Sequence, residues 1–462
     1  MTVCYVPDSR PVHSTGPAEQ GVPRQSDPGW SGCSVYAREV GMARPQQPAG
    51  APRTTRLRRA QAVLTSLSAV IATTVVAGPA TAAGAGGPCT LERTEAHHSE
   101  GLDSWNRNYP RPVRSLRAAM VFLSFPDAAP KVTPARLAAD HTPATGDFFQ
   151  RASYGRFSLR VHSLRHWITM PKASTAYAIQ RDWNSARRAA YLRDAIRAAD
   201  PHLDFGRYDI VYLVADPDAP GVDADATKVV NFERPLRADG KDLRRLVTVF
   251  EHHPPDRHVL AHETGHVFDL PDLYHRPSTA DNSGDWDTYV GDWDLMGSQF
   301  GLSPDPFGWH KWKLGWLTGR QVVCARALGP KMYTLQPLSA PMEGRPGADT
   351  RTRLVVVRTG PTTALAIEAR GAYGNDAGTC TEGVLVYRVR NDAASGEGPV
   401  RVLDGHPATS ACWNESVYPE LADAPLGVGD SLLAREEAVR VTVTGRATGG
   451  SWAVQVTRGE RT

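Results

Sequence analysis

The sequence lacks a large excess of charge of either sign. Its 52 Lys and Arg residues stand against 49 Asp and Glu, a formal net charge of +3 over 462 residues. A chain that coats nucleic acid needs a strongly basic surface, so this balance excludes that class of protein. A hydrophobic content of 41% and an aromatic content of 8% also exclude a largely disordered chain.

Long, uninterrupted apolar runs are also missing, which excludes a multi-spanning membrane protein. The clearest apolar stretch, residues 62–78, contains Thr and Ser and is marginal in length for one span. A basic cluster at Arg53–Arg59 precedes it, and the small residues Ala80-Thr-Ala82 follow it. This order is typical of a secretory signal peptide, so residues 1–82 are predicted to be a disordered leader and signal peptide. An uncleaved membrane anchor is the alternative, and Met42 is an alternative start of the chain.

Without this leader, the remaining chain has no basic excess. The leader contains eight Arg and four acidic residues, which leaves 44 basic and 45 acidic residues in 380 residues. Four cysteines remain, and an even number in an exported chain predicts two disulfides. We favour Cys380–Cys412, because this pair closes a local loop, and therefore Cys89–Cys324, although the other pairings stay open. No C-x-x-C spacing is present, so a structural zinc finger is not expected.

Helix-like and strand-like segments alternate from about residue 110 to residue 320, inside a first domain predicted to span residues 83–322. Residues 118–125 and 208–215 are continuous apolar runs bounded by turn residues, which predicts two buried strands. Residues 182–199 carry Ala, Leu and Ile at helical spacing, which predicts an amphipathic helix. A helix between strands favours an α/β arrangement in this region.

After residue 322, the pattern changes to short β-rich runs separated by Gly, Pro and Asn. The runs are residues 353–358, 364–368, 383–389, 439–444 and 451–456. Long helical patterns are absent from this part of the sequence. Residues 323–462 are therefore predicted to form a separate, β-sandwich-like domain.

The sequence His262-Glu263-x-x-His266 is the motif with the clearest chemistry. Residues four apart lie on one face of a helix, so both imidazoles can point at one metal ion. Glu263 lies beside that face, where a carboxylate can take a proton from a metal-activated water during attack on a carbonyl. Turn residues on both sides predict a helix that Asp256 caps and that ends at about Phe268. Surface histidines on an ordinary helix are the alternative interpretation.

A catalytic zinc site needs a third protein ligand and one open position. No Glu occurs between residues 264 and 342, which argues against a glutamate ligand on a downstream helix. Asp269, Asp272 and His275 are the remaining candidates. We favour Asp272 because it follows the predicted helix end, where the chain can turn back under the metal.

The stretch His262–Tyr274, followed by Trp293-Asp-Leu-Met-Gly297, resembles the immune inhibitor A family of secreted bacterial metallopeptidases. That family is metzincin-like and has the pattern H-E-x-x-H-x-x-G-L-P-D-x-Y with a later Met-turn. The segments Ser153-Tyr-Gly155 and Pro306–Trp316 also match it, and the resemblance covers residues 115–320 well. The resemblance implies that His262, His266 and Asp272 are zinc ligands. It also implies that Glu263 is the general base and that Met296 forms the Met-turn.

Two features depart from the family pattern. Asp269 stands where the family has Gly, at a point where the chain leaves the helix with positive φ. Asp tolerates this conformation better than most residues, so Asp269 is either harmless, weakens the site or competes for the metal. In addition, only about thirty residues separate the signal site from the first predicted strand, so a long inhibitory prosegment is not evident.

Several polar residues near the motif allow more than one interpretation. Tyr289 and His310 are candidates for stabilising the transition state. His258 is expected beside the site or on the surface, because a fourth ligand would close the open position. One loop is rich in side-chain oxygens that either hold Ca²⁺ or are simply solvated. Its members are Asp281, Asn282, Asp285, Asp287, Asp292 and Asp294.

Together, these patterns predict an α+β protein with a zincin/metzincin-like catalytic domain followed by a β-sandwich-like domain. The expected function is a secreted zinc endopeptidase that hydrolyses extracellular proteins, with Zn²⁺ as cofactor and Ca²⁺ as a further candidate. The expected partners are protein or peptide substrates. We expect a monomer without nucleic acid and without stable membrane association. The alternatives are a secreted binding module with a decayed metal site and a zinc amidase that acts on cell-wall polymer.

Overall fold

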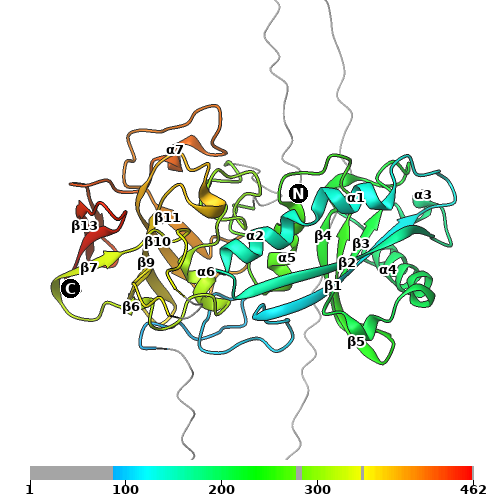
Figure 1. Cartoon of the computed structure of the whole chain (residues 1–462), viewed down its shortest axis with the longest axis horizontal. Coiled ribbons are helices and arrows are strands. Elements are labelled where there is room, and N and C mark those ends of the chain that lie inside the picture. Colours follow the sequence, from blue (N-terminus) through cyan, green and yellow to red (C-terminus); the bar gives the residue numbers. More distant parts are fainter. Residues whose placement is uncertain (1–86, 277–283, 345–347, 460–462) are drawn as a thin grey trace, which may run out of the picture. The chain divides into compact units, whose positions relative to one another are not determined.

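Five strands form the first sheet of the computed structural model, which describes residues 87–276, 284–344 and 348–459. The strands are β1 (Arg114–Ser124), β2 (Phe157–Thr169), β3 (Ile210–Ala215), β4 (Lys228–Ala238) and β5 (Lys241–Val249), in the order β2-β1-β3-β5-β4. Four of them are parallel, whereas β4 lies at one edge, antiparallel to β5 (Figure 1). The predicted strands at 118–125 and 208–215 correspond to β1 and β3, and all of β3 is buried, as is typical of a central parallel strand. The predicted leader, residues 1–82, lies outside the described residues.

Helices accompany this sheet and the chain that follows it. The α-helices are α1 (Pro134–His141), α2 (Ala144–Ala152), α3 (Ser174–Tyr177), α4 (Ser185–Ala199), α5 (Val259–Val267), α6 (Gly308–Lys313) and α7 (Pro419–Ala422). Short 3₁₀ turns are η1 (Asp200–His202), η2 (Phe205–Arg207), η3 (Ala224–Ala226) and η4 (Gly374–Asp376). Helix α4 confirms the helix predicted at 182–199. Within the described ranges, no helix has both the length and the apolar character needed to cross a membrane.

Helix α5 carries the H-E-x-x-H motif, and its end agrees with the prediction to within one residue. Its predicted cap is wrong. The N-cap residue is His258, which has a left-handed φ of 58° and makes no side-chain capping bond. The Asp256 carboxylate instead accepts a hydrogen bond from Gln299 at 3.1 Å.

The chain after residue 322 is rich in strands, as predicted. One sheet has the order β11-β10-β9-β8-β6 and the other the order β12-β13-β14-β7. Their strands are β6 (Val322–Cys324), β7 (Gly329–Leu335), β8 (Leu354–Arg358), β9 (Thr363–Arg370), β10 (Gly383–Arg390), β11 (Val400–Leu403), β12 (Ser431–Ala434), β13 (Val439–Arg446) and β14 (Trp452–Arg458). Apolar side chains from both sheets share one hydrophobic cluster, as in a β-sandwich.

The sheet β11-β10-β9-β8-β6 is buried on both faces. Val355 and Ile367 belong to the cluster shared with the second sheet. Val356 and Ala366, which point to the opposite face, belong to the large cluster that also contains β1 and β3. This alternation with a period of two explains why the described residues from 87 onward belong to one compact unit. The α+β class is confirmed, whereas a metzincin-like domain and a boundary at residue 322 stay predictions.

Two disulfides tie distant parts of the chain together. They join Cys89 to Cys324 and Cys380 to Cys412, which confirms the favoured pairing.

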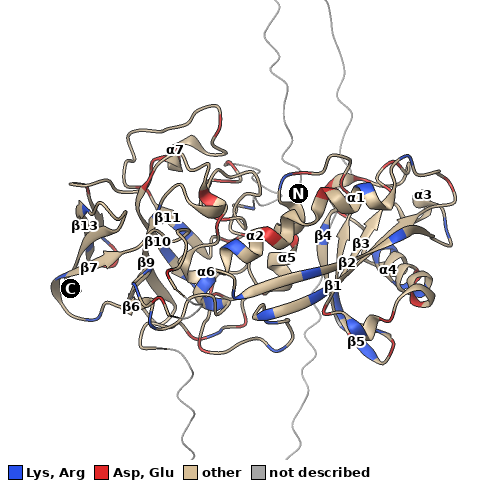
Figure 2. Cartoon of the chain, viewed as in Figure 1, with Lys and Arg blue, Asp and Glu red and all other residues tan. Residues whose placement is uncertain are grey.

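Basic and acidic residues are interspersed along the helices and strands, in agreement with the balanced composition (Figure 2).

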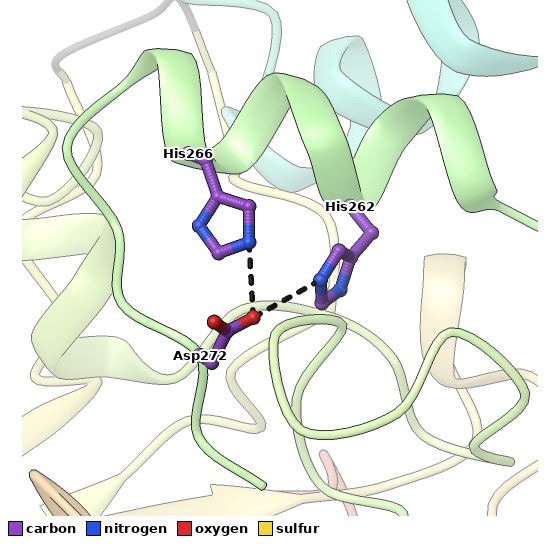
Figure 3. Close-up of side chains that lie close together, drawn as sticks. All are labelled: His262, His266 and Asp272. Atoms are coloured by element: carbon purple, nitrogen blue, oxygen red, sulfur yellow. Dashed lines mark ion pairs between the residues drawn. The ribbon is translucent and has the colours of Figure 1, made fainter. Parts of the chain in front are cut away.

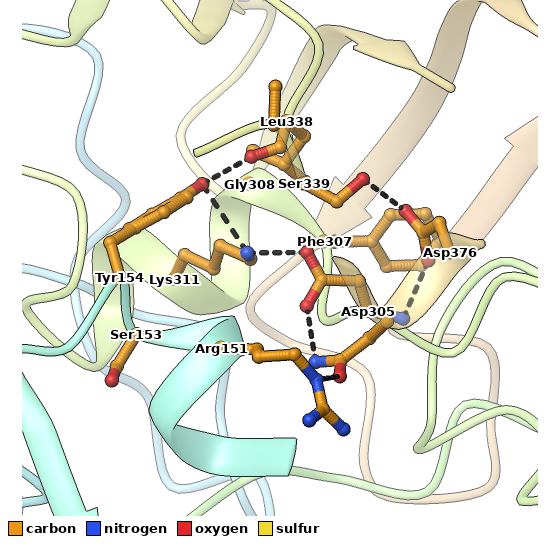
Figure 4. Close-up of polar contacts among 12 residues, drawn as sticks. Arg151, Ser153, Tyr154, Asp305, Phe307, Gly308, Lys311, Leu338, Ser339 and Asp376 are labelled. Carbon is orange, nitrogen blue, oxygen red and sulfur yellow. Dashed lines mark hydrogen bonds and ion pairs between the residues drawn. The ribbon is translucent and has the colours of Figure 1, made fainter. Parts of the chain in front are cut away.

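Two segments outside the H-E-x-x-H motif, Ser153–Gly155 and Pro306–Trp316, meet in a buried polar network (Figure 4). The Lys311 ammonium contacts Asp305 at 2.5 Å and donates to the hydroxyl of Tyr154 at 3.3 Å. That hydroxyl donates to the Leu338 carbonyl at 2.6 Å. The buried charge of Lys311 is therefore paired, and the network links α2 to α6 and to the β-rich part of the chain.

Candidate metal centre

Three predicted ligands come together at the end of α5. His262 and His266 lie one turn apart on the helix, and Asp272 follows where the chain turns back beneath it (Figure 3). The Asp272 Oδ1 atom is 3.0 Å from Nε2 of His266 and 3.4 Å from Nε2 of His262. One ligand atom from each residue lies within 4.8 Å of the other two. This spacing allows all three atoms to contact one ion.

Hydrogen bonds to the backbone determine which ring nitrogens face the cluster. Nδ1 of His262 is 2.9 Å from the Leu295 carbonyl, and Nδ1 of His266 is 2.8 Å from the Leu270 carbonyl. A carbonyl can only accept, so each Nδ1 carries a hydrogen, and in a neutral ring Nε2 presents a lone pair. Apart from these two rings, the buried Asp272 Oδ1 has no hydrogen-bond donor in the described structure. When both rings are neutral, three acceptor atoms face one another, and a proton or a cation among them would satisfy the cluster.

Two positive species can satisfy this cluster. Burial acts to lower the pKa of His266, but the Asp272 carboxylate outweighs it and raises that pKa to about 9. The two histidines in turn hold the pKa of Asp272 well below its usual range, against the effect of its burial. A proton on His266 is one solution. A divalent metal is the other, and the N, N, O donor set is one that zinc favours.

Glu263 lies beside the cluster and is buried, with 4% of its surface exposed. Its Oε2 atom has no hydrogen-bond partner among the described residues. Leaving a buried carboxylate oxygen unpaired is costly, so such an atom in a cleft marks a position where a ligand or a water completes the bonding. Glu263 is thus placed to exchange a proton with a molecule bound at the cluster.

Met296 lies directly against α5 at Gly265. A Cβ atom added to Gly265 would lie 2.4 Å from the Met296 sulfur, so the helix and this turn approach as closely as glycine allows. Met296 is fully buried, and its carbonyl accepts a hydrogen bond from the Leu273 amide at 2.9 Å. The turn therefore supports both the helix and the segment that carries Asp272.

The other two candidates for third ligand point elsewhere. Asp269 has a φ of 64°, the conformation that Gly favours, and its carboxylate contacts Arg93 at 2.6 Å and His98 at 2.9 Å. Burial acts to raise the pKa of Asp269, but these partners and Lys313 hold it below its usual range. His275 is 3.0 Å from the Tyr289 hydroxyl through Nδ1. Neither residue belongs to the three-residue cluster.

The cluster opens into a cleft of about 550 Å³. One wall comes from the edge strand β4 and includes Lys228, Val229 and Asn231. The lining also includes His97, from the segment before β1, and Ser395, from the loop after β10. Sequence reasoning missed these two residues, because their contacts span more than a hundred positions and leave no local pattern.

Several other predictions are corrected or confirmed by the structure. His310 cannot contact a substrate, because it is fully buried between Glu100 at 2.7 Å and Asp294 at 2.9 Å. Tyr289 is not among the residues that line the cleft. His258 is not among the residues that line the cleft, and its ring packs on Phe148 with ring centres 5.2 Å apart.

The proposed Ca²⁺ loop is described only in part. Asp281 and Asn282 lie outside the described residues, so calcium binding stays a prediction. Asp292 accepts hydrogen bonds from the amides of Leu302 and Val417, and Asp294 accepts from the Met296 amide. These two carboxylates therefore stabilise turns. In the described ranges, the group formed by His262, His266 and Asp272 is the only set of three close ligand atoms.

A scan against models of known protein families and a search of curated protein sequences found no match to this chain.

Proposed function

We propose that this protein is a secreted zinc-dependent endopeptidase of the immune inhibitor A type. The observation that carries the proposal is the convergence of three acceptor atoms beside the unpaired carboxylate oxygen of Glu263. Two His nitrogens and one carboxylate oxygen leave one position open in a tetrahedral zinc site. When bound there, zinc would polarise a scissile carbonyl and lower the pKa of water.

Glu263 is the proposed general base. Its buried carboxylate takes a proton from the attacking water and delivers it to the nitrogen of the leaving amine. Burial favours this transfer, because few competing water molecules can hydrogen-bond the carboxylate. The carbonyls of Leu295 and Leu270 hold the two imidazoles in the tautomer that leaves Nε2 free.

An extended peptide is the substrate that the cleft favours. Strand β4 pairs only with β5 in the described sheet and lines the cleft with three residues. An exposed strand edge can bind an extended segment through main-chain hydrogen bonds, which suits polypeptides of varied sequence. The same wall would also accept the peptide part of a cell-wall polymer. The test therefore compares casein with cell-wall peptides as substrates, to separate an endopeptidase from an amidase.

Secretion is part of the proposal. Two disulfides are typical of proteins that mature in an oxidising compartment, and the predicted signal peptide would direct the chain there. The alternative of a decayed metal site rested on Asp269, whose carboxylate turns away from the cluster toward Arg93 and His98.

The test compares Glu263→Gln with the unchanged protein. We expect the variant to bind about one zinc ion per chain and to lose casein hydrolysis by at least about 10²-fold, because the amide cannot accept the proton. The unchanged enzyme should lose activity with a chelator and regain it with zinc. Glu415→Gln, which changes an exposed residue in the same way, is the matched control. Full activity of Glu263→Gln would refute the assignment, and activity on cell-wall peptides but not casein would favour the amidase.

A further inference from the structure

We infer that Ser395, in the loop between β10 and β11, positions the Asp272 carboxylate as the third metal ligand. The β-rich part of the chain, which contains Ser395, would therefore contribute a residue to the metal centre. The inference rests on the proposed function, since it concerns the same site. It is carried by the contacts of Asp272 and of the loop that reaches it.

The two oxygens of Asp272 face different partners. Oδ1 faces the two imidazoles, at 3.0 and 3.4 Å. Oδ2 accepts hydrogen bonds from the Ser395 hydroxyl at 3.0 Å and from Arg276 at 3.2 Å. Donors on Oδ2 fix the rotation of the carboxylate and direct Oδ1 toward the histidines, as outer partners of metal ligands generally do.

Ser395 holds both the backbone and the side chain of Asp272. Its oxygen accepts a hydrogen bond from the Asp272 amide at 2.8 Å while its hydrogen is donated to Oδ2. The next residue, Gly396, donates its amide to the Asp272 carbonyl at 3.0 Å and accepts from the Arg276 amide at 3.2 Å. Gly396 has a φ of 79°, and a Cβ atom there would lie 3.2 Å from Cβ of Arg276. This close pairing of two segments needs glycine.

Arg276 is the weaker of the two anchors. Its side chain is 58% exposed, whereas that of Asp272 is 8% exposed. An exposed arginine loses side-chain entropy when it is held in one geometry, and solvent screens its charge. Ser395 is half-buried and its backbone is held on both sides, so its hydroxyl is already oriented.

The loop itself is held by the segment that precedes β1. The Ser395 amide donates to the His97 carbonyl at 3.2 Å, and the Ser99 hydroxyl donates to the Asn391 carbonyl at 2.8 Å. The Asn391 side chain in turn donates to the carbonyl of Glu92. The loop is therefore held at its start, through Asn391, and at its middle, through Ser395, which gives Ser395 a defined position against Asp272.

The experiment measures metal affinity in the full-length secreted protein. Metal-free Ser395→Ala, Ser395→Thr and the unchanged protein are titrated with Zn²⁺ against a competing chelator, and with Co²⁺ while its visible absorption is followed. We expect Ser395→Ala to weaken Zn²⁺ binding by about 10- to 100-fold and to alter the Co²⁺ spectrum. Ser395→Thr keeps the hydroxyl and should stay within about threefold of the unchanged protein.

Ser431→Ala is the matched control, because it removes the hydroxyl of an exposed residue at the start of strand β12, in the same part of the chain. Thermal unfolding of the metal-free proteins shows whether the variants fold. Equal Zn²⁺ affinity of Ser395→Ala and the control would overturn this inference and leave the proposed function standing. An equal loss in the Ala and Thr variants would also overturn it, because the hydroxyl would then be irrelevant. No Zn²⁺ binding by the unchanged protein would overturn the proposed function and this inference with it.

Discussion

His310 shows how much one buried residue can contribute when its charge is paired. Burial acts to lower its pKa, but Glu100 and Asp294 outweigh burial and raise the pKa of His310 to about 10. All three side chains are fully buried. The imidazolium therefore joins the segment before β1 to helix α6 and to the turn that carries Met296.

The raised pKa predicts how stability depends on pH. An unfolded histidine loses its proton near pH 6.5, whereas folded His310 keeps it to about pH 10. The stabilisation is thus fully present below about pH 6.5 and is lost as the pH rises toward 10. We expect the free energy of unfolding to fall by a few kcal/mol over this range, measured by urea denaturation at several pH values.

His310→Gln supplies the control for this pH dependence. Gln cannot be protonated, so the variant should be less stable at pH 6 by about 3–5 kcal/mol and show a flatter pH profile between 7 and 9. The same slope in both proteins would show that other groups cause it.

At the residue scale, the motif predicts which side chains lie together, because its information is local. His262, Glu263, His266 and Asp272 lie within eleven consecutive residues, and helical spacing alone brings the two histidines together. Ser395 and Arg93 were not predictable, since a contact across more than a hundred residues leaves no periodic trace. Asp269 was only partly predictable. Its positive φ follows from the resemblance, but its partners Arg93 and His98 do not.

At the scale of elements, helix α5 depends on close contact with the turn at Met296. Gly265 has no side chain, and a Cβ atom in its place would lie 2.4 Å from Sδ and 3.2 Å from Cε of Met296. Met296 is fully buried, so its side chain has little room to move away.

We therefore expect Gly265→Ala to destabilise the protein. Ala favours a helix over Gly by about 1 kcal/mol, but crowding in a packed core costs about 1–3 kcal/mol. In a Met296→Ala background the crowding is absent, and the same substitution should be neutral or stabilising. Urea unfolding of the four proteins measures this coupling. An identical effect of Gly265→Ala in both backgrounds would contradict the close contact.

The predicted elements are those with strong periodic patterns. Strands β1 and β3 and helix α4 were predicted because long apolar runs or helical spacing marked them. The hairpin of β4 and β5 was missed, although Asp239-Gly240 at its turn was a usable signal. Both residues have positive φ, at 48° and 72°, as a two-residue turn of type I′ requires. The start of α5 was misplaced because His258, its N-cap residue, has a left-handed conformation that Gly and Asn adopt more readily than His.

At the scale of the whole molecule, the disulfides close loops of very different length. Cys89 and Cys324 are 235 residues apart, whereas Cys380 and Cys412 are 32 residues apart. A longer loop restricts the unfolded chain more. The Cys89–Cys324 bond also fixes the segment that carries His97 and His98 to the end of β6.

This difference predicts unequal effects on stability. By loop-closure entropy, replacing Cys89 and Cys324 with Ala should lower the free energy of unfolding by about 2 kcal/mol more than replacing Cys380 and Cys412. Chemical denaturation of both double variants under oxidising conditions measures this. A larger loss from the shorter loop would show that native packing outweighs the entropy of the unfolded chain.

The whole-molecule arrangement was the least predictable part. The β-rich character of residues 323–462 followed from their short apolar runs. The shared burial of the sheet β11-β10-β9-β8-β6 did not, because an alternating strand pattern does not say what covers each face. Pairing of the cysteines was predicted from their number and from the short loop between Cys380 and Cys412.

The bond between Ser395 and Asp272 also has a consequence in time. A ribosome that adds about 5–20 residues per second needs roughly 6–25 s to extend the chain by the 123 residues between them. During that interval, the nascent polypeptide contains every residue of the H-E-x-x-H motif but has no hydroxyl to orient its aspartate. With the proposed function, this order of synthesis means that full metal affinity comes only after most of the chain has left the ribosome, which would limit damage to the cell that makes it.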